Sequence, residues 1–320
     1  MHSNPLMSIV VMTYNSSKYV IETLDSAYNQ TYPNIELIVT DDCSSDDTVK
    51  LVDIWIGHHR NRFLNCQLIT SSVNSGIPAN INKGIRKCKG EWVKIIAGDD
   101  ILLPKCIENL ITYIRDNAKA DIVIGKIKPF YFLSGNKKYK RPLPRSVKRY
   151  IFSKESDFQY HYLLERSFNI APGAFIKRGL YDKIGFYDEK YKMLEDLPFW
   201  IKATRSGIRL YLINKPCVQY RTEHESAVFA QKHLYNKRFV DCLYQFHRNE
   251  IWNNVPFWKV SYYESILIDM FVYYIGINIF NNSKSLIFSI FKNVMQYLRI
   301  ALYYEKFYDM YHSGKVLWNH

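Results

Sequence analysis

Short apolar runs alternate with helix-like segments over residues 8–127, and this alternation restricts the fold more than any other feature of the sequence. The apolar runs stop at polar residues, as strands buried on both faces do, and they lie at 8–15, 35–42, 66–72, 91–100 and 121–127. The segments between them repeat apolar residues at helical spacing, at 18–30, 44–55, 78–88 and 104–117. Strands that alternate with helices form βαβ units, so the sequence predicts an α/β fold with a doubly wound, mostly parallel sheet.

Pairs of acidic residues follow two of these predicted strands directly. Asp41 and Asp42 end the second strand, and Asp99 and Asp100 end the fourth. Right-handed crossovers place these ends, together with Thr13–Asn15 after the first strand, along one edge of the sheet, where α/β proteins bind ligands. A single acidic pair is also typical of a solvated turn, but two pairs at neighbouring strand ends favour a ligand site.

The composition favours an anionic partner. The formal net charge is +13, from 43 basic and 30 acidic residues, which suits nucleic acid, nucleotide phosphates or an acidic membrane face. Basic residues concentrate at 135–150 beside Pro142 and Pro144, so we expect an exposed loop there. The 6 cysteines include no CxxC pair, which argues against a zinc site or a disulfide framework. The apolar run at 7–12 is too short for the core of a signal peptide, and we expect a cytoplasmic protein.

The second half of the chain changes character along its length. Glu195 and Asp196 precede Pro198, so they are expected in the first turn of a helix that Gly207 ends, where acidic residues stabilise the helix dipole. From about residue 229 the sequence predicts aromatic-rich helices, whose apolar runs fall short of the roughly 20 residues that a bilayer span needs. We therefore expect a domain at 1–228 and a helical C-terminal region at 229–320 that serves as a lid, an oligomer contact or a membrane-surface contact.

Five segments then carry a resemblance to a known family. They are "SIVVMTYN", "IELIVTDDCSSDDT", "NSGIPANINKG", "GEWVKIIAGDD" and "MLEDLPFW", in this order. Together they resemble a family 2 glycosyltransferase with the GT-A fold, over roughly residues 6 to 226. The absence of a glycine in the "TYNSSKY" turn disfavours a dinucleotide-binding dehydrogenase.

The resemblance implies an activity and its partners. A sugar would pass, with inversion, from a nucleotide-diphosphate sugar to a hydroxyl of a glycan or lipid-linked oligosaccharide acceptor, in bacterial surface polysaccharide (O-antigen or capsule) synthesis. A UDP-sugar is the first donor expected and a dTDP-sugar the second, and nucleic acid is not an expected partner. Peripheral attachment to the anionic inner face of the cytoplasmic membrane, or a homodimer, would fit such a protein. The alternative is a catalytically degenerate scaffold, which Ala97 and Ile81 favour because the family commonly has Asp and Arg there.

The resemblance also assigns the donor-binding residues. Asp99 and Asp100 match the metal-binding DxD region, where Mg²⁺ or Mn²⁺ would neutralise the diphosphate. Asp42 matches the carboxylate that accepts the imide N–H of uracil or thymine, and Asp41 is expected to be structural. The remaining matches to nucleotide-binding positions are Thr13, Tyr14, Asn15, Asn74, Gly76 and Asn82.

The catalytic assignments come from two later segments. Asp196 matches the family's catalytic base, which would take the proton of the acceptor hydroxyl, and Glu195 would hold its position and charge. In "YRTEHESA", His224 matches a residue that can approach the metal or the diphosphate, although this chain has one extra residue before it. Arg221 is an alternative partner for the diphosphate charge.

Overall fold

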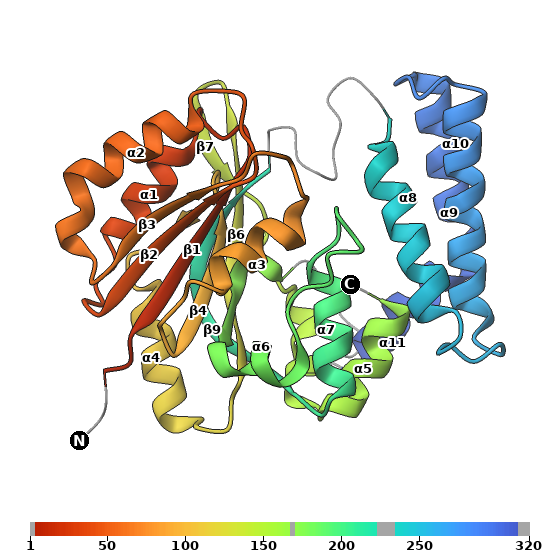
Figure 1. The fold of residues 1–320 in the computed structure, drawn as a ribbon. Helices are drawn as coiled ribbons and strands as arrows, with labels where there is room; N and C mark the ends of the chain where they lie inside the picture. Colours follow the sequence, from red (N-terminus) through yellow and green to blue (C-terminus); the bar gives the residue numbers. More distant parts are fainter. Residues whose placement is uncertain (1–3, 167–169, 223–233, 313–320) are drawn as a thin grey trace. The chain divides into compact units, whose positions relative to one another are not determined.

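The computed structural model describes residues 4–166, 170–222 and 234–312 and divides into two compact units (Figure 1). The sheet unit comprises Met1–Ser146, Ile151–Leu163 and Ser167–Glu223, and the helical unit comprises Val147–Tyr150, Leu164–Arg166 and His224–His320. The predicted domain boundary at residue 228 lies outside the described residues and stays a prediction.

The sheet unit is built on one nine-stranded sheet with the order β3-β2-β1-β4-β8-β6-β9-β5, and β7 pairs with β6. The first four strands of that order are parallel to one another, as the sequence predicts. They are β1 (Met7–Thr13), β2 (Ile35–Asp41), β3 (Cys66–Thr70) and β4 (Trp92–Ala97). The fold class is therefore the predicted one.

Helices on both faces explain the continuous apolar runs of β1 and β2. Ile9, Val11, Leu37 and Val39 belong to the core that α1 and α2 cover, together with α4. Val10 and Thr40 point to the opposite face, where the α carbon of Gly84 in α3 lies against them. The bounds of these helices are α1 (Val20–Tyr28), α2 (Thr48–His59), α3 (Ile77–Ile85) and α4 (Cys106–Asp116).

The rest of the sheet departs from a simple alternation. β8 (Ala174–Lys177) lies between β4 and β6 (Ile122–Leu133) and is antiparallel to both. The basic segment was expected to be a loop, but part of it forms β7 (Asn136–Tyr139), a hairpin with β6. The long last strand, β9 (Leu210–Arg221), pairs with β6 and with the short β5 (Ile101–Leu102). The hairpin went unpredicted because Lys and Asn have low strand propensity.

The remaining helices of this part of the chain are α5 (Ser156–Glu165), α6 (Arg178–Ile184) and α7 (Asp196–Arg205). Helix α7 begins where the sequence predicts, and Gly207 follows its end with φ of 81°. A positive φ suits glycine because it has no Cβ.

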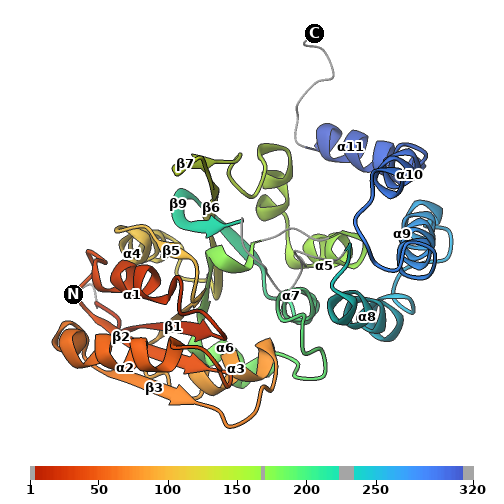
Figure 2. The same ribbon diagram turned by 90° about the horizontal axis from the view of Figure 1, so that it is seen from above.

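The helical unit contains the predicted aromatic helices (Figure 2). They are α8 (Lys237–Phe246), α9 (Val260–Asn278), α10 (Leu286–Tyr297) and α11 (Ile300–His312), with a π-helical turn at His247–Ile251. An ion pair between Arg299 and Asp269 joins the start of α11 to α9. Among the described helices, none has both the length and the hydropathy to cross a membrane.

Candidate active site

The carboxyl ends of β1, β2 and β4 meet at one edge of the sheet. In the parallel register Thr13 lies beside Asp41, and Met12 lies beside Ala97. The turn after β1, the acidic pair after β2 and the acidic pair after β4 are therefore neighbours, as the sequence predicts.

The turn after β1 is held by the loop after β2. The Thr13 hydroxyl donates to Asp41 Oδ2 at 2.7 Å, and Ser44 donates to the same carboxylate through its N–H and its hydroxyl. Asn15 Oδ1 accepts from the N–H of Ser45 at 2.9 Å. Asp41 thus has the structural contacts expected of it, and the side chains of Tyr14 and Asn15 are both exposed in this turn, Tyr14 with 53% of its surface.

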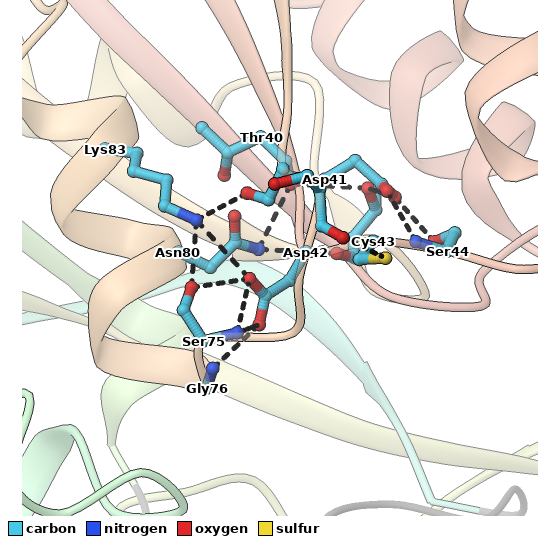
Figure 3. A network of polar contacts seen from close by, with 12 residues as sticks. Thr40, Asp41, Asp42, Cys43, Ser44, Ser75, Gly76, Asn80 and Lys83 are labelled. Atoms are coloured by element: carbon cyan, nitrogen blue, oxygen red, sulfur yellow. Dashed lines mark hydrogen bonds and ion pairs between the residues drawn. The ribbon is translucent and has the colours of Figure 1, made fainter.

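Asp42 closes the β3–α3 loop onto the end of β2 (Figure 3). Its carboxylate accepts from the N–H of Ser75 at 3.0 Å, the hydroxyl of Ser75 at 2.7 Å and the N–H of Gly76 at 2.8 Å. Lys83 Nζ lies 3.5 Å from Asp42 Oδ1. Gly76 has φ of 95°, and a Cβ there would meet the carbonyl oxygen of Lys192 at 2.8 Å, so its place in the motif is explained by backbone packing.

The two motif asparagines differ sharply in position. Asn74 is exposed in the β3–α3 loop. Asn82 is fully buried, and its amide donates to Tyr187 O at 2.9 Å and to Glu189 Oε1 at 2.8 Å while it accepts from the N–H of Tyr187. Asn82 is thus engaged in holding the segment that leads to α7, and these contacts give it a structural role.

Asn80, which the sequence analysis did not single out, is the α3 side chain that reaches the strand ends. Its Nδ2 donates to Thr13 O at 3.3 Å and to Thr40 O at 3.2 Å. The position of Asn80 on the helix could have identified it. Residues two apart on a helix point to nearly opposite sides, so Asn80 and Asn82 cannot both face the strand ends.

Asp99 and Asp100 have different environments. Asp100 is buried, and its Oδ1 accepts from the backbone N–H of Arg221 at 2.9 Å. Burial, followed by the neighbouring Asp99 charge, raises the pKa of Asp100 well above its usual value. Asp99 is partly exposed, so it is the member of the pair that a bound cation can reach more easily.

Arg221 fixes the acidic pair in place. Its Nε donates to Asp99 O at 3.0 Å, and its guanidinium pairs with Glu22 of α1. The guanidinium carbon also lies 4.2 Å from the centre of the Tyr19 ring and 4.7 Å from that of Phe130. Arg221 is 3% exposed, so these contacts give it a positioning role behind the pair.

Lys94 is a second buried cation near this pair, and the sequence analysis missed it. It is fully buried in β4, where its Nζ donates to Pro172 O, to Ile95 O at 3.1 Å and to Ala174 O at 3.3 Å. Burial lowers its pKa, and Asp100 is among the groups that oppose this shift. A lysine inside an apolar strand was the signal available in the sequence.

Glu195 and Asp196 form a second acidic pair at the start of α7. Asp196 Oδ1 accepts from the N–H of Leu197 at 2.6 Å, and both residues are partly buried. Burial and the charge of Asp196 raise the pKa of Glu195 to about 8, and burial raises the pKa of Asp196. Two carboxyl groups that resist ionising together favour sharing one proton.

Tyr220 on β9 relates the two acidic pairs. Burial raises its pKa, and so do the charges of Asp100, Asp99, Glu195 and Asp196. One phenol hydroxyl therefore lies within electrostatic range of both pairs. Tyr220 is not among the site residues predicted from the sequence, and His224 lies outside the described residues.

The acidic pair after β4 would fit a cation that takes its other ligands from phosphate oxygens and water. Within the described residues, no group of three or more His, Cys, Asp or Glu side chains forms a ready metal site. Mg²⁺ in phosphate-transfer sites is commonly held by one or two carboxylates together with substrate phosphates and water. The partly exposed Asp99 offers that kind of donor set.

The chain belongs to glycosyl transferase family 2, whose model matches residues 8–185. Among curated relatives it is 26% identical over 282 residues to an uncharacterized glycosyltransferase of Methanocaldococcus jannaschii, covering 84% of this chain and 89% of that one. It is 27% identical over 241 residues to the poly(ribitol-phosphate) beta-N-acetylglucosaminyltransferase TarS of Staphylococcus aureus, covering 74% of this chain but 39% of TarS.

Solved structures confirm the fold. TarS 1–349 in complex with UDP-GlcNAc superposes with a TM-score of 0.56 at 21% identity, over 82% of this chain and 80% of that one. TarS 1–349 in complex with UDP gives a TM-score of 0.54 at 20% identity, over 98% and 93%. The predicted GT-A fold is therefore confirmed.

The raised pKa of Glu195 predicts a pH-dependent stability. The folded protein keeps the carboxyl proton up to about pH 8, whereas the unfolded chain loses it near pH ~4.3. The folded state therefore loses stability as the pH rises between these values. We expect Glu195→Gln to raise the midpoint of urea unfolding at pH 8.5 and to change it much less at pH 5. Equal shifts at the two pH values would contradict the burial of this charge.

Proposed function

We propose that this protein is an inverting glycosyltransferase that moves a sugar from a UDP-sugar to a hydroxyl of a glycan acceptor. The observation that carries the proposal is the position of the acidic pair after β4, at the sheet edge where β1 and β2 also end. A second acidic pair lies within electrostatic range of the same tyrosine, Tyr220. One pair ends β4, at the ligand-binding edge of the sheet, and the other begins α7. Sugar transfer from a diphosphate needs a cation site that neutralises the leaving group and a base that takes the proton of the acceptor hydroxyl. The two acidic pairs could meet one need each.

The donor would lie along the ends of β1, β2 and β4. Tyr14 is exposed there for contact with the nucleotide, and Asp42 lies at the end of β2 as the acceptor for the uracil imide. Asp99, with Asp100 behind it, would hold Mg²⁺ or Mn²⁺ against the diphosphate. When bound, the cation would neutralise the charge that develops on the leaving diphosphate. The relative TarS has structures with UDP-GlcNAc and UDP, which supports UDP as the first choice of nucleotide.

Asp196 would act as the general base. Its carboxylate accepts one backbone N–H and keeps other lone pairs for the acceptor hydroxyl. The partial burial that raises its pKa also makes the ionised form a stronger base. One base without a second nucleophile suits a single in-line displacement, which inverts the anomeric carbon.

Replacing Asp196 tests the base directly. We expect Asp196→Asn to lower kcat by at least about 100-fold, because general-base catalysis commonly contributes that much, and to leave UDP affinity largely unchanged. Asp182→Asn, an exposed substitution on α6, is the matched control. Release of UDP from a panel of UDP-sugars with Mn²⁺ and a glycan acceptor measures the effect. Full activity in Asp196→Asn would contradict the assignment, and no UDP release by the wild type would favour the degenerate scaffold.

Replacing the β4 carboxylates tests the cation. We expect Asp99→Ala to weaken Mn²⁺-dependent UDP binding by at least about 10- to 100-fold, because even the loss of a group that supports a metal ligand commonly costs that much. Asp100→Asn should weaken it less, because the amide oxygen can still accept from Arg221. Asp116→Ala, exposed at the end of α4, is the control. Calorimetric titration with UDP, once with Mn²⁺ present and once with excess chelator, measures these affinities. UDP binding that is unchanged by the chelator would contradict the proposed role of the cation.

We further propose that the acceptor is lipid-linked and that the helical unit contacts an anionic membrane. Several apolar side chains of α9 and α10 are exposed, namely Leu267, Phe271, Tyr274, Leu286, Ile287, Ile290, Val294 and Tyr297. The chain has no acidic residue between Asp269 and Glu305, while Lys284 and Lys292 are exposed there. Exposed apolar and aromatic side chains with cations beside them suit a lipid headgroup region.

Vesicle sedimentation tests this contact. We expect the full chain to sediment with anionic vesicles at low salt and to be released in part at high salt, because salt screens the charges. The double change Ile287→Asp and Ile290→Asp should abolish sedimentation, and Ile54→Asp on an exposed position of α2 should not. A wild-type chain that stays in the supernatant and elutes as a dimer would assign these helices to a second copy.

A further inference from the structure

Lys83 on α3 presents an ammonium group beside the Asp42 carboxylate (Figure 3). Its Nζ donates to Ser75 Oγ at 2.8 Å and to the Ser71 hydroxyl, and it lies 3.5 Å from Asp42 Oδ1. The Lys83 side chain is 31% exposed, whereas that of Asp42 is 4% exposed. A cation that a ligand can reach therefore lies next to a nearly buried acceptor.

This pair matches one edge of one class of base. Uracil offers an imide N–H flanked by the O2 and O4 carbonyls, so a carboxylate can accept from the N–H while a neighbouring ammonium donates to O4. Cytosine has an amino group in place of the O4 carbonyl and an unprotonated N3. It would set donor against donor at Lys83 and acceptor against acceptor at Asp42. The pair therefore favours uracil over cytosine at both contacts.

The contacts around Asp42 show what must change for a base to enter. The N–H groups of Ser75 and Gly76 and the Ser75 hydroxyl already occupy the carboxylate oxygens. The two backbone donors are fixed by the loop, but the Ser75 hydroxyl can rotate and the Lys83 side chain can swing. Both can leave the carboxylate without any backbone movement.

We propose that Lys83 is a specificity-determining residue that donates to the O4 carbonyl of the uracil ring, beside the imide contact at Asp42. In the structure its ammonium is held by Ser71 and Ser75, and donor binding would transfer it to the base. This inference rests on the proposed function, since it requires a uridine nucleotide at the end of β2. It adds a residue that the motif comparison did not assign.

Nucleotide selectivity is the quantity that tests this role. We expect the full-length wild type, titrated calorimetrically with Mn²⁺ present, to bind UDP more tightly than CDP. Lys83→Met should weaken UDP binding roughly 10- to 100-fold, the range for a hydrogen bond to a charged group, and should weaken CDP binding much less. Lys87→Met, an exposed lysine just beyond the end of α3, should change neither affinity.

A second variant separates base recognition from support of the loop. Ser71→Ala removes one of the serine contacts of Lys83 but keeps its ammonium, so the preference for UDP over CDP should persist. Equal losses of UDP and CDP affinity in Lys83→Met would overturn the proposal, and so would an equal loss of the preference for UDP in Ser71→Ala. Lys83 would then only stabilise the β3–α3 loop. If the wild type binds neither nucleotide, the proposed donor fails, and the role of Lys83 fails with it. UDP binding that Lys83→Met leaves unchanged would overturn the Lys83 role alone.

Discussion

The candidate site depends on the buried guanidinium of Arg221. A guanidinium removed from water is costly unless every neighbour compensates for the lost hydration. Here Glu22 supplies a charge, Asp99 supplies a carbonyl oxygen, and the rings of Tyr19 and Phe130 cover its faces. These partners come from α1, the end of β4 and β6. Arg221 thereby fixes the last strand of the sheet against the acidic pair that the first half of the fold provides.

The electrostatics of the sheet unit converge on the same place. Two acidic pairs lie within electrostatic range of one tyrosine hydroxyl, and the pKa values of Asp100, Glu195 and Asp196 are raised. Burial disfavours ionisation of each carboxyl group, and each carboxylate that is already ionised makes ionisation of its neighbours more costly. Arg221 and Lys94 oppose this from inside the protein, through contacts that hold both cations in place. A site with this excess of carboxylates is suited to a cation that arrives with a ligand.

Much of this arrangement could be predicted from the sequence, because it depends on periodicity. The buried strands, the helices between them and the carboxylates at Asp42 and Asp99 follow from apolar runs that end at polar residues. The motif comparison was less informative within α3, where Asn80 reaches the strand ends and Asn82 holds the segment before α7. A linear motif does not tell which side of a helix faces the ligand-binding edge. That depends on how the helix is rotated against the sheet, which the packing of Gly84 against Val10 and Thr40 decides.

The sequence by itself determined the fold class, the family and the order of the site segments, since strand and helix periods and adjacent acidic residues are local properties of the chain. The tertiary structure decided which side chain performs which task. It buried Asp100 and left Asp99 partly exposed, turned Arg221 inward, and brought Lys83 beside Asp42 and Tyr220 within range of both acidic pairs. Each of these outcomes depends on contacts between residues far apart in the chain, such as β9 with the turn after β4 or α3 with β2. Such contacts form only when the whole sheet is assembled, and no local pattern encodes them.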